Sequence, residues 1–395
     1  MSEARINRIS NEKGDGGPSL SGITTFSGLN YFVPPKGTTA ERPSDCPPGS
    51  IRFNTDSAHI EYFDGLQWLE FEASSEELGG SLTGAATTFS TNGMGHRGVI
   101  MGKDSSNNEM EFLTISTLGW TQDFGTLTRT NAVSNAGFGS RTRGFAAGGG
   151  SPEVATTDTF VFASTGNATS FGDVTQARRN ASAVANTTRG VNLGGWGPTA
   201  GGDPNGYVTT IDYCTMASTG TWVDFGDTLF ELEFIGQSAA SSSVRGVWGG
   251  GATSTPALAT RVNTIQYVTI STTGNSLDFG DLVTAKAQIS AVGSSTRALF
   301  AGGNTPSITS NEINFITIAS TGNGQDFGDL ATARRCSGSP TSPTRGVFAG
   351  GYAPTATRNI EYVTIATTGN GQEFGEITNQ TRRRSGSCSN GHGGL

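Results

Sequence analysis

The sequence predicts an all-β protein in which a six-bladed β-propeller follows an extended N-terminal arm and a small three-stranded β module. The first observation is an arginine-led segment that recurs at Arg97, Arg143, Arg189, Arg245, Arg297 and Arg345. The second is a Phe-Gly pair that keeps the same spacing, at Phe124, Phe171, Phe225, Phe279, Phe327 and Phe374. Two independent markers with a period of about 50 residues indicate a tandem repeat, and such periods are typical of propeller blades or solenoid units.

The composition favours short strands joined by tight turns. Glycine accounts for 58 of the 395 residues, and only 15% of the residues are charged. Long helices need runs of Ala, Leu, Glu and Lys, in which this chain is poor, whereas turns use glycine. The hydrophobic share of 34% is low for a globular domain, but it suits a repeated β-fold in which each sheet buries alternate residues.

Charge and hydropathy argue against several classes of protein. The formal net charge of −8 disfavours nucleic-acid binding, because phosphate neutralisation needs a basic surface. No apolar run approaches the ~20 residues of a membrane span, so we expect no membrane insertion. Residues 1–17 lack the apolar core of a secretory signal peptide. The cysteines have no metal-binding spacing and are expected to be unpaired thiols of a protein made in a reducing cytosol.

The first 75 residues form a separate region in this prediction. Residues 1–17 are polar and should be a flexible arm, or a segment that a partner orders. Residues 18–75 contain an apolar patch, a proline-rich stretch that should be extended and stiff, and a three-stranded meander. The Asp64-Gly65 pair predicts a two-residue hairpin loop in this meander. A sheet of this size is marginal alone, so we expect its exposed aromatic residues to pack on a neighbouring copy, on the main domain or on a docking partner. The expected docking residues are Phe26, Tyr31, Phe32, Ile51, Phe53, Tyr62 and Trp68.

The meander carries a resemblance to known proteins. The run PGSIRFNT at residues 48–55, followed by IEYFDGLQW at residues 60–68, resembles a small β module of bacteriophage virion proteins. In those proteins the module often lies near the virion-proximal end of tail fibres and related appendages. The resemblance implies that this N-terminal segment docks onto other virion proteins.

Residues 80–395 hold the repeat array. In the copy from Ala177 to Asp227, four short runs separated by turns predict the four antiparallel strands of one propeller blade. The order of signals resembles the kelch repeat, although phenylalanine of the Phe-Gly marker stands where kelch repeats have tryptophan. The Arg-Gly-Val-Phe-Ala-Gly-Gly pattern also resembles repeat proteins of marine phages. Strand-like segments lie at residues 82–96 and 377–392, and one of them should complete the blade that begins at the other end of the array. The sequence does not decide which of the two does so.

The repeated polar residues predict structural roles. One arginine at an equivalent place in each repeat favours a fixed ion pair or backbone hydrogen bonds, and the alternative is a ring of arginines for an anionic ligand. The aspartate of Phe-Gly-Asp is a candidate partner of these arginines, or it caps a turn. The Gly-Gly pairs lack the lysine and the helix of a phosphate loop. The alternation of Glu231 and Glu233 with apolar residues fits a strand with a wet face better than a catalytic pair. The three histidines lie in unrelated contexts. We therefore expect no catalytic residue, no metal and no cofactor, and a protein that is not an enzyme.

The loop after Gly195 is the strongest candidate for ligand binding. It is longer than its equivalents, and recognition usually resides in loops carried by a rigid scaffold. The alternative is an ordinary solvent loop. The candidate ligand-binding residues are Trp196, Asp203, Asn205 and Trp248.

Together these features predict a phage structural protein that is made in the host cytoplasm and located in the virion. We expect a homo-oligomeric tail-fibre or appendage component that presents its propeller to a host-surface glycan or protein receptor. One alternative is a capsid, neck or baseplate decoration protein without a host ligand. The other is a polysaccharide depolymerase, which would need two acids in one groove.

Overall fold

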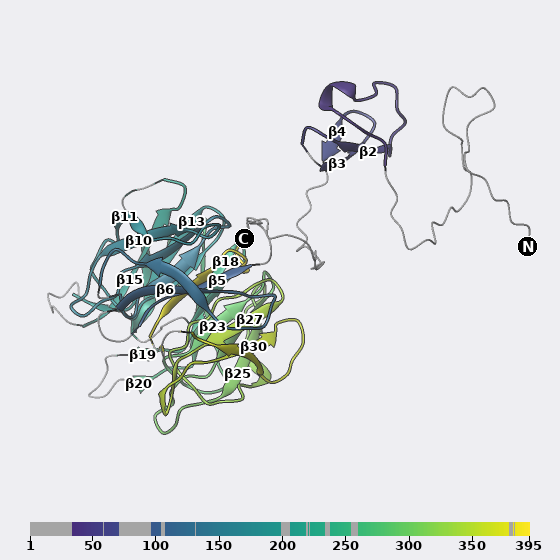
Figure 1. Ribbon diagram of the computed structural model, residues 1–395. Coiled ribbons are helices and arrows are strands. Elements are labelled where there is room, and N and C mark those ends of the chain that lie inside the picture. The colour runs from purple at the N-terminus through teal and green to yellow at the C-terminus, as the bar shows by residue number, and fades with distance from the viewer. Residues whose placement is uncertain are drawn as a thin grey trace, which may run out of the picture. The chain divides into compact units, whose positions relative to one another are not determined.

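The computed structural model describes residues 34–57, 59–70, 96–103, 107–130, 132–198, 206–218, 220, 222–233, 238–253, 260–378, 382 and 384–395. The chain divides into two compact units, Met1–Ser75 and Glu76–Leu395. The regular secondary structure of the described residues is β-strand apart from one 3-10 turn (Figure 1), so the predicted all-β class is confirmed.

The first unit contains a four-stranded sheet in the order β1-β2-β3-β4. The strand β1 runs parallel to β2, and the other neighbours are antiparallel. The elements are β1 (Lys36–Gly37), the 3-10 turn η1 (Thr39–Glu41), β2 (Ile51–Asn54), β3 (His59–Phe63) and β4 (Trp68–Glu70).

Two expectations for this unit were wrong. The proline-rich stretch is not merely extended, because it supplies β1 and η1. The hairpin loop has four residues, 64–67, because Phe63 pairs with Trp68. The carboxylate of Asp64 accepts hydrogen bonds from the backbone N–H groups of Leu66 at 2.7 Å and Gln67 at 2.8 Å. Such side-chain-to-backbone bonds stabilise a longer turn than the two-residue loop that Asp-Gly alone predicts.

The second unit consists mainly of antiparallel four-stranded sheets, which we number along the chain (Figure 1). The first sheet contains β32 (Gly386–Ser389), β5 (Arg97–Lys103), β6 (Asn107–Thr114) and β7 (Gln122–Thr126). The second contains β8 (Ala136–Gly139), β9 (Arg143–Ala147), β10 (Thr156–Val161) and β11 (Thr169–Asp173). The third contains β12 (Ser182–Ala185), β13 (Arg189–Leu193), β14 (Trp196–Gly197), β15 (Gly206–Thr215) and β16 (Val223–Leu232).

The remaining sheets repeat this pattern. The fourth contains β17 (Ala239–Ser241), β18 (Arg245–Gly249), β21 (Thr264–Thr269) and β22 (Leu277–Asp281). The fifth contains β23 (Ser290–Gly293), β24 (Arg297–Ala301), β25 (Glu312–Thr317) and β26 (Gln325–Asp329). The sixth contains β27 (Arg345–Ala349), β30 (Asn359–Thr364) and β31 (Gln372–Glu376). Residues 338–341 bridge to β27 as its innermost neighbour. Two short hairpins are β19 (Ala252–Thr253) with β20 (Thr260–Arg261), and β28 (Tyr352–Ala353) with β29 (Thr355–Ala356).

The C-terminal strand completes the first sheet. β32 pairs antiparallel with β5, with Gly386 opposite Met101 and Ser389 opposite Gly98. Residues 82–96 and 377–392 could each have supplied this strand. The C-terminal segment does so, and most of residues 82–96 lies outside the described residues. The last strand of the chain therefore joins the first strand of the repeat array.

Buried apolar side chains fill the space between neighbouring sheets. Because successive residues of a strand point to opposite faces, Val99 of the first sheet packs with the second sheet, while Ile100 packs with the sixth. Other clusters join the second sheet to the third, the third to the fourth, the fourth to the fifth, and the fifth to the sixth. Each sheet is thus buried on both faces, so the expectation that only alternate residues are buried was wrong for strands such as β9, β13, β24 and β27.

The repeated arginines tie each sheet to the next through backbone carbonyls. The guanidinium of Arg189 donates to the carbonyls of Ile270 at 3.2 Å and Ser271 at 2.8 Å, and lies 4.5 Å from the ring centre of Tyr213. No ion pair among the described residues joins a repeated arginine to a Phe-Gly-Asp carboxylate, so that part of the expectation was wrong. The equivalent bonds run from Arg97 to Phe162, Arg143 to Met216, Arg245 to Ile318 and Ala319, Arg297 to Ile365 and Ala366, and Arg345 to Ile115 and Ser116.

A second set of basic residues, which the sequence reasoning missed, makes the buried ion pairs. Arg334 between the fifth and sixth sheets pairs with Glu361 of β30, and both side chains are almost fully buried. Each such residue follows the Phe-Gly marker by five to eight positions, and this regular offset was a readable signal. The set is Arg129 with Asp158, Arg178 with Asp212, Lys286 with Glu312, Arg334 with Glu361, and Arg382 with Glu111.

Candidate functional site

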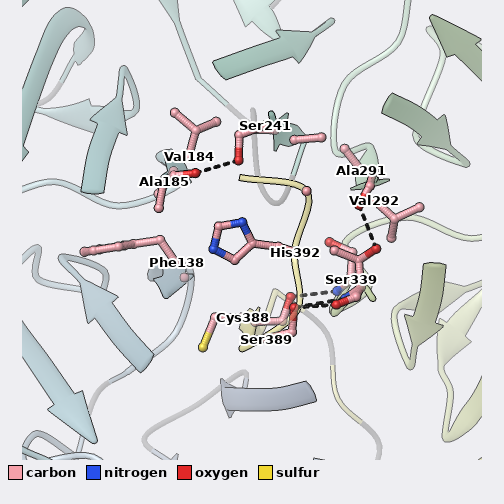
Figure 2. Close-up of a pocket in the computed structure, with 18 residues that line it drawn as sticks. Phe138, Val184, Ala185, Ser241, Ala291, Val292, Ser339, Cys388, Ser389 and His392 are labelled. Atoms are coloured by element: carbon pink, nitrogen blue, oxygen red, sulfur yellow. Dashed lines mark hydrogen bonds between the residues drawn. The ribbon is translucent and has the colours of Figure 1, made fainter. Parts of the chain in front are cut away.

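The innermost strands enclose a narrow cavity. Lining residues come from β8, β12, β17, β23, β32 and the segment 338–341, one contribution from each sheet (Figure 2). Its volume is about 50 Å³, which is room for only a few water molecules. Serine and threonine hydroxyls, with small apolar side chains, dominate the lining. The cavity between the innermost strands is therefore part of a packed centre and is too small to be a ligand pocket.

The C-terminal tail closes one end of this cavity. His392 lies among the inner strands (Figure 2), and its Nε2 is 2.6 Å from the carbonyl oxygen of Gly139. The backbone N–H of Gly394 donates to Nδ1 at 3.2 Å. These contacts select the neutral tautomer with the proton on Nε2. Because the surrounding protein desolvates the ring, the pKa of His392 falls to about 4. The histidine thus has a structural role.

The opposite end of the inner strands carries the loops that follow the Gly-Gly pairs. The backbone N–H of Gly150 donates to the carbonyl oxygen of Val133 at 2.8 Å, just before β8 begins. His392, in contrast, contacts Gly139, the residue at which β8 ends. Residues with positive φ precede the inner strands at this end, and backbone hydrogen bonds connect several of them. We call this set the collar: Ser134, Asn180, Gln288, Cys336 and Arg384.

Trp196, a candidate ligand-binding residue, lies on the short strand β14 at the loop end. It is half-buried on β14, makes an edge-to-face contact with Tyr207 at 5.3 Å, and lies 5.9 Å from the guanidinium of Arg179. Arg179 also pairs with Glu153 of the second sheet at 3.0 Å. The tryptophan is therefore held in a charged, partly accessible setting that a ligand could contact.

Trp248 cannot belong to this surface. Its side chain is fully buried on β18, in the cluster that joins the third and fourth sheets. Its burial follows from the strand pattern, because both faces of β18 pack against neighbouring sheets. Asp203 and Asn205, the other two candidates, lie outside the described residues.

The two glutamates on β16 and beside it have different environments. Glu231 is exposed, but Glu233 is buried and accepts a 2.6 Å hydrogen bond from Asn180. Burial raises the pKa of Glu233. The wet face of β16 thus includes Asp227, Leu229 and Glu231 but ends before Glu233, and the expectation that both glutamates face solvent was wrong.

The module of the first unit buries its charged face. Glu61 accepts hydrogen bonds from Arg42 at 2.6 Å and Asn54 at 3.2 Å, and pairs with Arg52 at 3.2 Å. The side chains of Arg52 and Glu61 are nearly inaccessible to solvent. Trp68 belongs to this side of the sheet, where its ring lies 5.8 Å from the guanidinium of Arg52. Trp68 is half-buried and lies over this internal ion pair, on the other face from Ile51, Phe53 and Tyr62, and its docking role stays a prediction.

The opposite face of the module is apolar and partly exposed. Cross-strand pairs place Ile51, Tyr62 and Leu69 in one row, and Phe53 with Ile60 in the next. Ile51 is 52% exposed and Ile60 is 42% exposed, although they project from the centre of a sheet. The usual arrangement, with apolar residues inside and charges outside, is reversed here. Of the predicted docking residues, Ile51, Phe53 and Tyr62 share this face, while Phe26, Tyr31 and Phe32 lie outside the described residues.

Neither a scan against models of known protein families nor a search of curated proteins finds a match to this chain. Across the described residues, no group of three His, Cys, Asp or Glu side chains is arranged to hold a metal ion. Within the same part of the chain, no helix has the length and apolarity that a membrane span requires.

Proposed function

We propose that the six sheets of the second unit are the blades of a closed, kelch-like β-propeller. Three kinds of contact that run from each sheet to the next also run from the sixth sheet to the first. Arg345 donates to Ile115 and Ser116, as Arg297 does to Ile365 and Ala366. Gly119 donates its N–H to Phe374 at 3.0 Å, as Gly369 does to Phe327 at 2.8 Å. An apolar cluster joins the sixth sheet to the first. A propeller is the architecture that returns to its start in this way.

We further propose that the protein is a phage virion structural protein. In this proposal it is a tail-fibre or appendage component that the first unit docks onto the particle and whose propeller faces the host surface. The observation that carries the proposal is the reversed module, with its charges inside and its apolar row outside. The sequence resemblance of residues 48–68 to virion modules supports the choice of partner.

The apolar face of the module is the docking surface in this proposal. Burial of apolar area contributes about 25 cal/mol per Å², so Ile51 and Ile60 gain stability when a partner covers them. The described side chains of β2, β3 and β4 on this face are apolar or aromatic, namely Ile51, Phe53, Ile60, Tyr62 and Leu69, and the exposed Lys36 of β1 borders them beside Phe53. The partner should therefore be an apolar surface patch on another virion protein.

Particles assembled with an Ile51→Ser/Ile60→Ser double variant should test this docking. Both residues are partly exposed, so the module should keep its fold, which circular dichroism would check. We expect the variant to be missing from purified particles analysed by mass spectrometry. Leu66→Ser is the matched control, because Leu66 is 92% exposed in the hairpin loop and lies off the sheet face. Normal incorporation of the double variant would contradict the docking proposal.

A decoration protein of the capsid, neck or baseplate would use the same docking surface without a host ligand. A glycan array probed with the full chain separates the two functions. Binding to host-surface saccharides supports the appendage function, and a blank array with normal incorporation into particles supports decoration. Release of soluble products from a host polysaccharide would instead identify a depolymerase.

A further inference from the structure

The turn between β6 and β7 departs from its counterparts in the other repeats. Where those repeats join threonine directly to glycine, this turn inserts Leu118 between Thr117 and Gly119. The backbone fixes the alignment, because the N–H of Gly119 donates to the carbonyl of Phe374 just as the equivalent glycines donate to the phenylalanine of the sheet before them. The next residue is Trp120, at the place held in four other repeats by Asn167, Asn275, Asn323 and Asn370.

These asparagines join neighbouring sheets in a way that tryptophan cannot. The side-chain oxygen of Asn370 accepts a 3.0 Å hydrogen bond from the backbone N–H of Asp329. An indole only donates, so Trp120 cannot accept the equivalent bond from Glu376. Trp120 is instead 60% exposed, and the inserted Leu118 is 58% exposed. Packing between the sheets therefore does not account for either residue. The matching bonds run from Thr126 to Asn167, Asp227 to Asn275, and Asp281 to Asn323.

A groove lies beside the two exposed residues, and we call it the Trp120 groove. Its lining comes from β6, from the turn and the start of β7, and from Phe374 of β31, so both the first and the sixth sheets contribute. Its volume is about 170 Å³, against about 50 Å³ for the central cavity. Leu118 and Trp120 form an apolar wall, and Gln122 adds an exposed amide.

Fixed polar groups lie next to the exposed ring. The guanidinium of Arg358 lies 5.8 Å from the ring centre of Trp120. Its Nε donates to the carbonyl of Ile377 at 2.7 Å and its Nη2 to that of Thr378 at 2.7 Å, so the backbone sets its orientation. Glu376 is 3.9 Å from Arg358, and the two side chains are 47% and 37% exposed. Hydrogen-bond donors and acceptors thus stand beside an accessible aromatic ring.

We propose that the Trp120 groove binds a neutral hexopyranose residue of a host-surface saccharide, with the apolar face of the sugar against the indole ring. This inference rests on the proposed host-recognition function and names its site and ligand class. A pyranose ring presents C–H groups on its faces and hydroxyls around its rim. The indole offers flat apolar surface for the face, and Arg358, Glu376 and Gln122 offer donors and acceptors for the hydroxyls.

Charge and size favour this occupant over others. The cation of Arg358 is balanced by Glu376, and the chain has a net charge of −8, so an anionic ligand gains little here. Of the described residues of β6, the turn and β31, only Leu118 and Trp120 are large apolar side chains that are exposed. A stable protein interface buries about 800 Å² on each partner, which two side chains do not supply.

Calorimetric titration and saturation-transfer NMR of the full chain test the proposal. The probes are tetramers of glucose, galactose and mannose, with an oligogalacturonate of equal length as the anionic comparison. We expect at least one neutral tetramer to bind, with an affinity that changes less than about twofold between low and physiological salt. Magnetisation should pass mainly to C–H protons on one face of the sugar.

Three variants make the test specific to the ring. Trp120→Asn should weaken binding at least tenfold while the Tm stays the same or rises, because it restores the asparagine of the other repeats. Trp120→Phe keeps an aromatic ring and should retain part of the affinity. Leu277→Ser is the matched control, since Leu277 is 56% exposed on the outer strand β22 and stands opposite Tyr267 as Gln122 stands opposite Phe112. It should bind like the wild type.

The outcomes separate this inference from the function on which it rests. Binding of one neutral tetramer that Trp120→Asn abolishes supports the site and identifies the sugar. Equal binding by Trp120→Asn and the wild type, in these titrations or on the glycan array, keeps host recognition but overturns the site. Binding of the oligogalacturonate alone, or of no probe, also overturns it. Self-association in sedimentation velocity that Trp120→Asn removes would show that a second copy covers the ring, and would overturn the saccharide site.

Discussion

The side chain of His392 shows how one residue can hold the end of the chain in place. Its ring uses both nitrogens, one toward Gly139 of the second sheet and one toward Gly394 of the tail itself. Protonation would remove the acceptor at Nδ1 and place a charge among the inner strands. The tail should therefore be sensitive to acid.

We predict an acid-dependent loss of stability that depends on His392. The pKa is about 4 in the folded protein and about 6.5 in the unfolded chain. Protons therefore bind preferentially to the unfolded chain as the pH falls from about 6.5 to about 4, and stability is lost over this range. The loss from this residue should be about 2 kcal/mol at pH 5. Urea unfolding of wild type and His392→Gln at pH 7.5 and pH 5 measures it, and an equal pH dependence in both proteins would rule out this role.

The repeated arginines lead to a second prediction. Arg189→Ala removes two hydrogen bonds to carbonyls and the contact with the Tyr213 ring. We expect a loss of about 2 to 3 kcal/mol in the free energy of unfolding. Arg189→Lys should recover only part of it, because lysine lacks the planar fork of donors. Denaturant titration measures both variants, and a loss of less than about 0.5 kcal/mol in Arg189→Ala would show that the contact is dispensable.

The Phe-Gly marker lies on the outer strand of each sheet, and its glycine contacts a turn of the neighbouring sheet. In β26, Gly328 has φ of +139°, and a Cβ on it would lie 2.6 Å from the carbonyl oxygen of Gly369. The register between β25 and β26 shifts close to this position. The glycine is thus required both by its backbone conformation and by the close approach of the next sheet.

A pair of alanine variants tests this requirement of the strand. Gly328→Ala should destabilise the protein by more than about 2 kcal/mol, because positive φ and overpacking both add to the cost. Gly369→Ala is the control from the same contact, since a Cβ there meets nothing within 4 Å. Thermal unfolding should show a large decrease in Tm for the first variant and a small one for the second. Equal Tm values would contradict the close packing between the two sheets.

The whole second unit depends on the joining of its two chain ends. β32 covers β5, and Arg382 pairs with Glu111 beside it. Without the C-terminal segment, β5 would present an unpaired edge, and such edges promote aggregation. The pairing of β32 with β5 therefore covers an edge that would otherwise be open.

Truncation at two positions should separate the contribution of β32 to stability from the contribution of the residues that follow it. A chain ending at Thr378 lacks β32 and should lose on the order of 10 °C in Tm and aggregate. A chain ending at Asn390 keeps β32 and the bond between Asn390 and the Arg97 N–H, and should lose only a few degrees. Calorimetry and size-exclusion chromatography measure both effects. An unchanged Tm in the shorter chain would contradict closure through β32.

Local patterns in the sequence predicted the all-β class, the repeat and most of its strands, because alternation, Arg-Gly starts and Gly-Gly ends each act within a few residues. They also predicted the antiparallel meander of the first unit, whereas Trp196, expected on a loop, lies on the short strand β14. The burial of Trp248 and the place of Trp68 over the internal ion pair of the module were not predictable in this way. Whether an aromatic residue faces solvent depends on what packs over its strand, and that partner comes from another part of the chain.

The folded structure alone revealed which chain end pairs with β5, which basic residues form ion pairs, and that the module is apolar on its exposed face. Arg334 and Glu361 are 27 residues apart, and Arg382 pairs with Glu111 across the whole repeat array. Contacts over such separations depend on how the sheets pack, which no local spacing encodes. The repeat therefore specified the strands of each sheet, while packing between the sheets decided which side chains meet and which surface stays open to a partner.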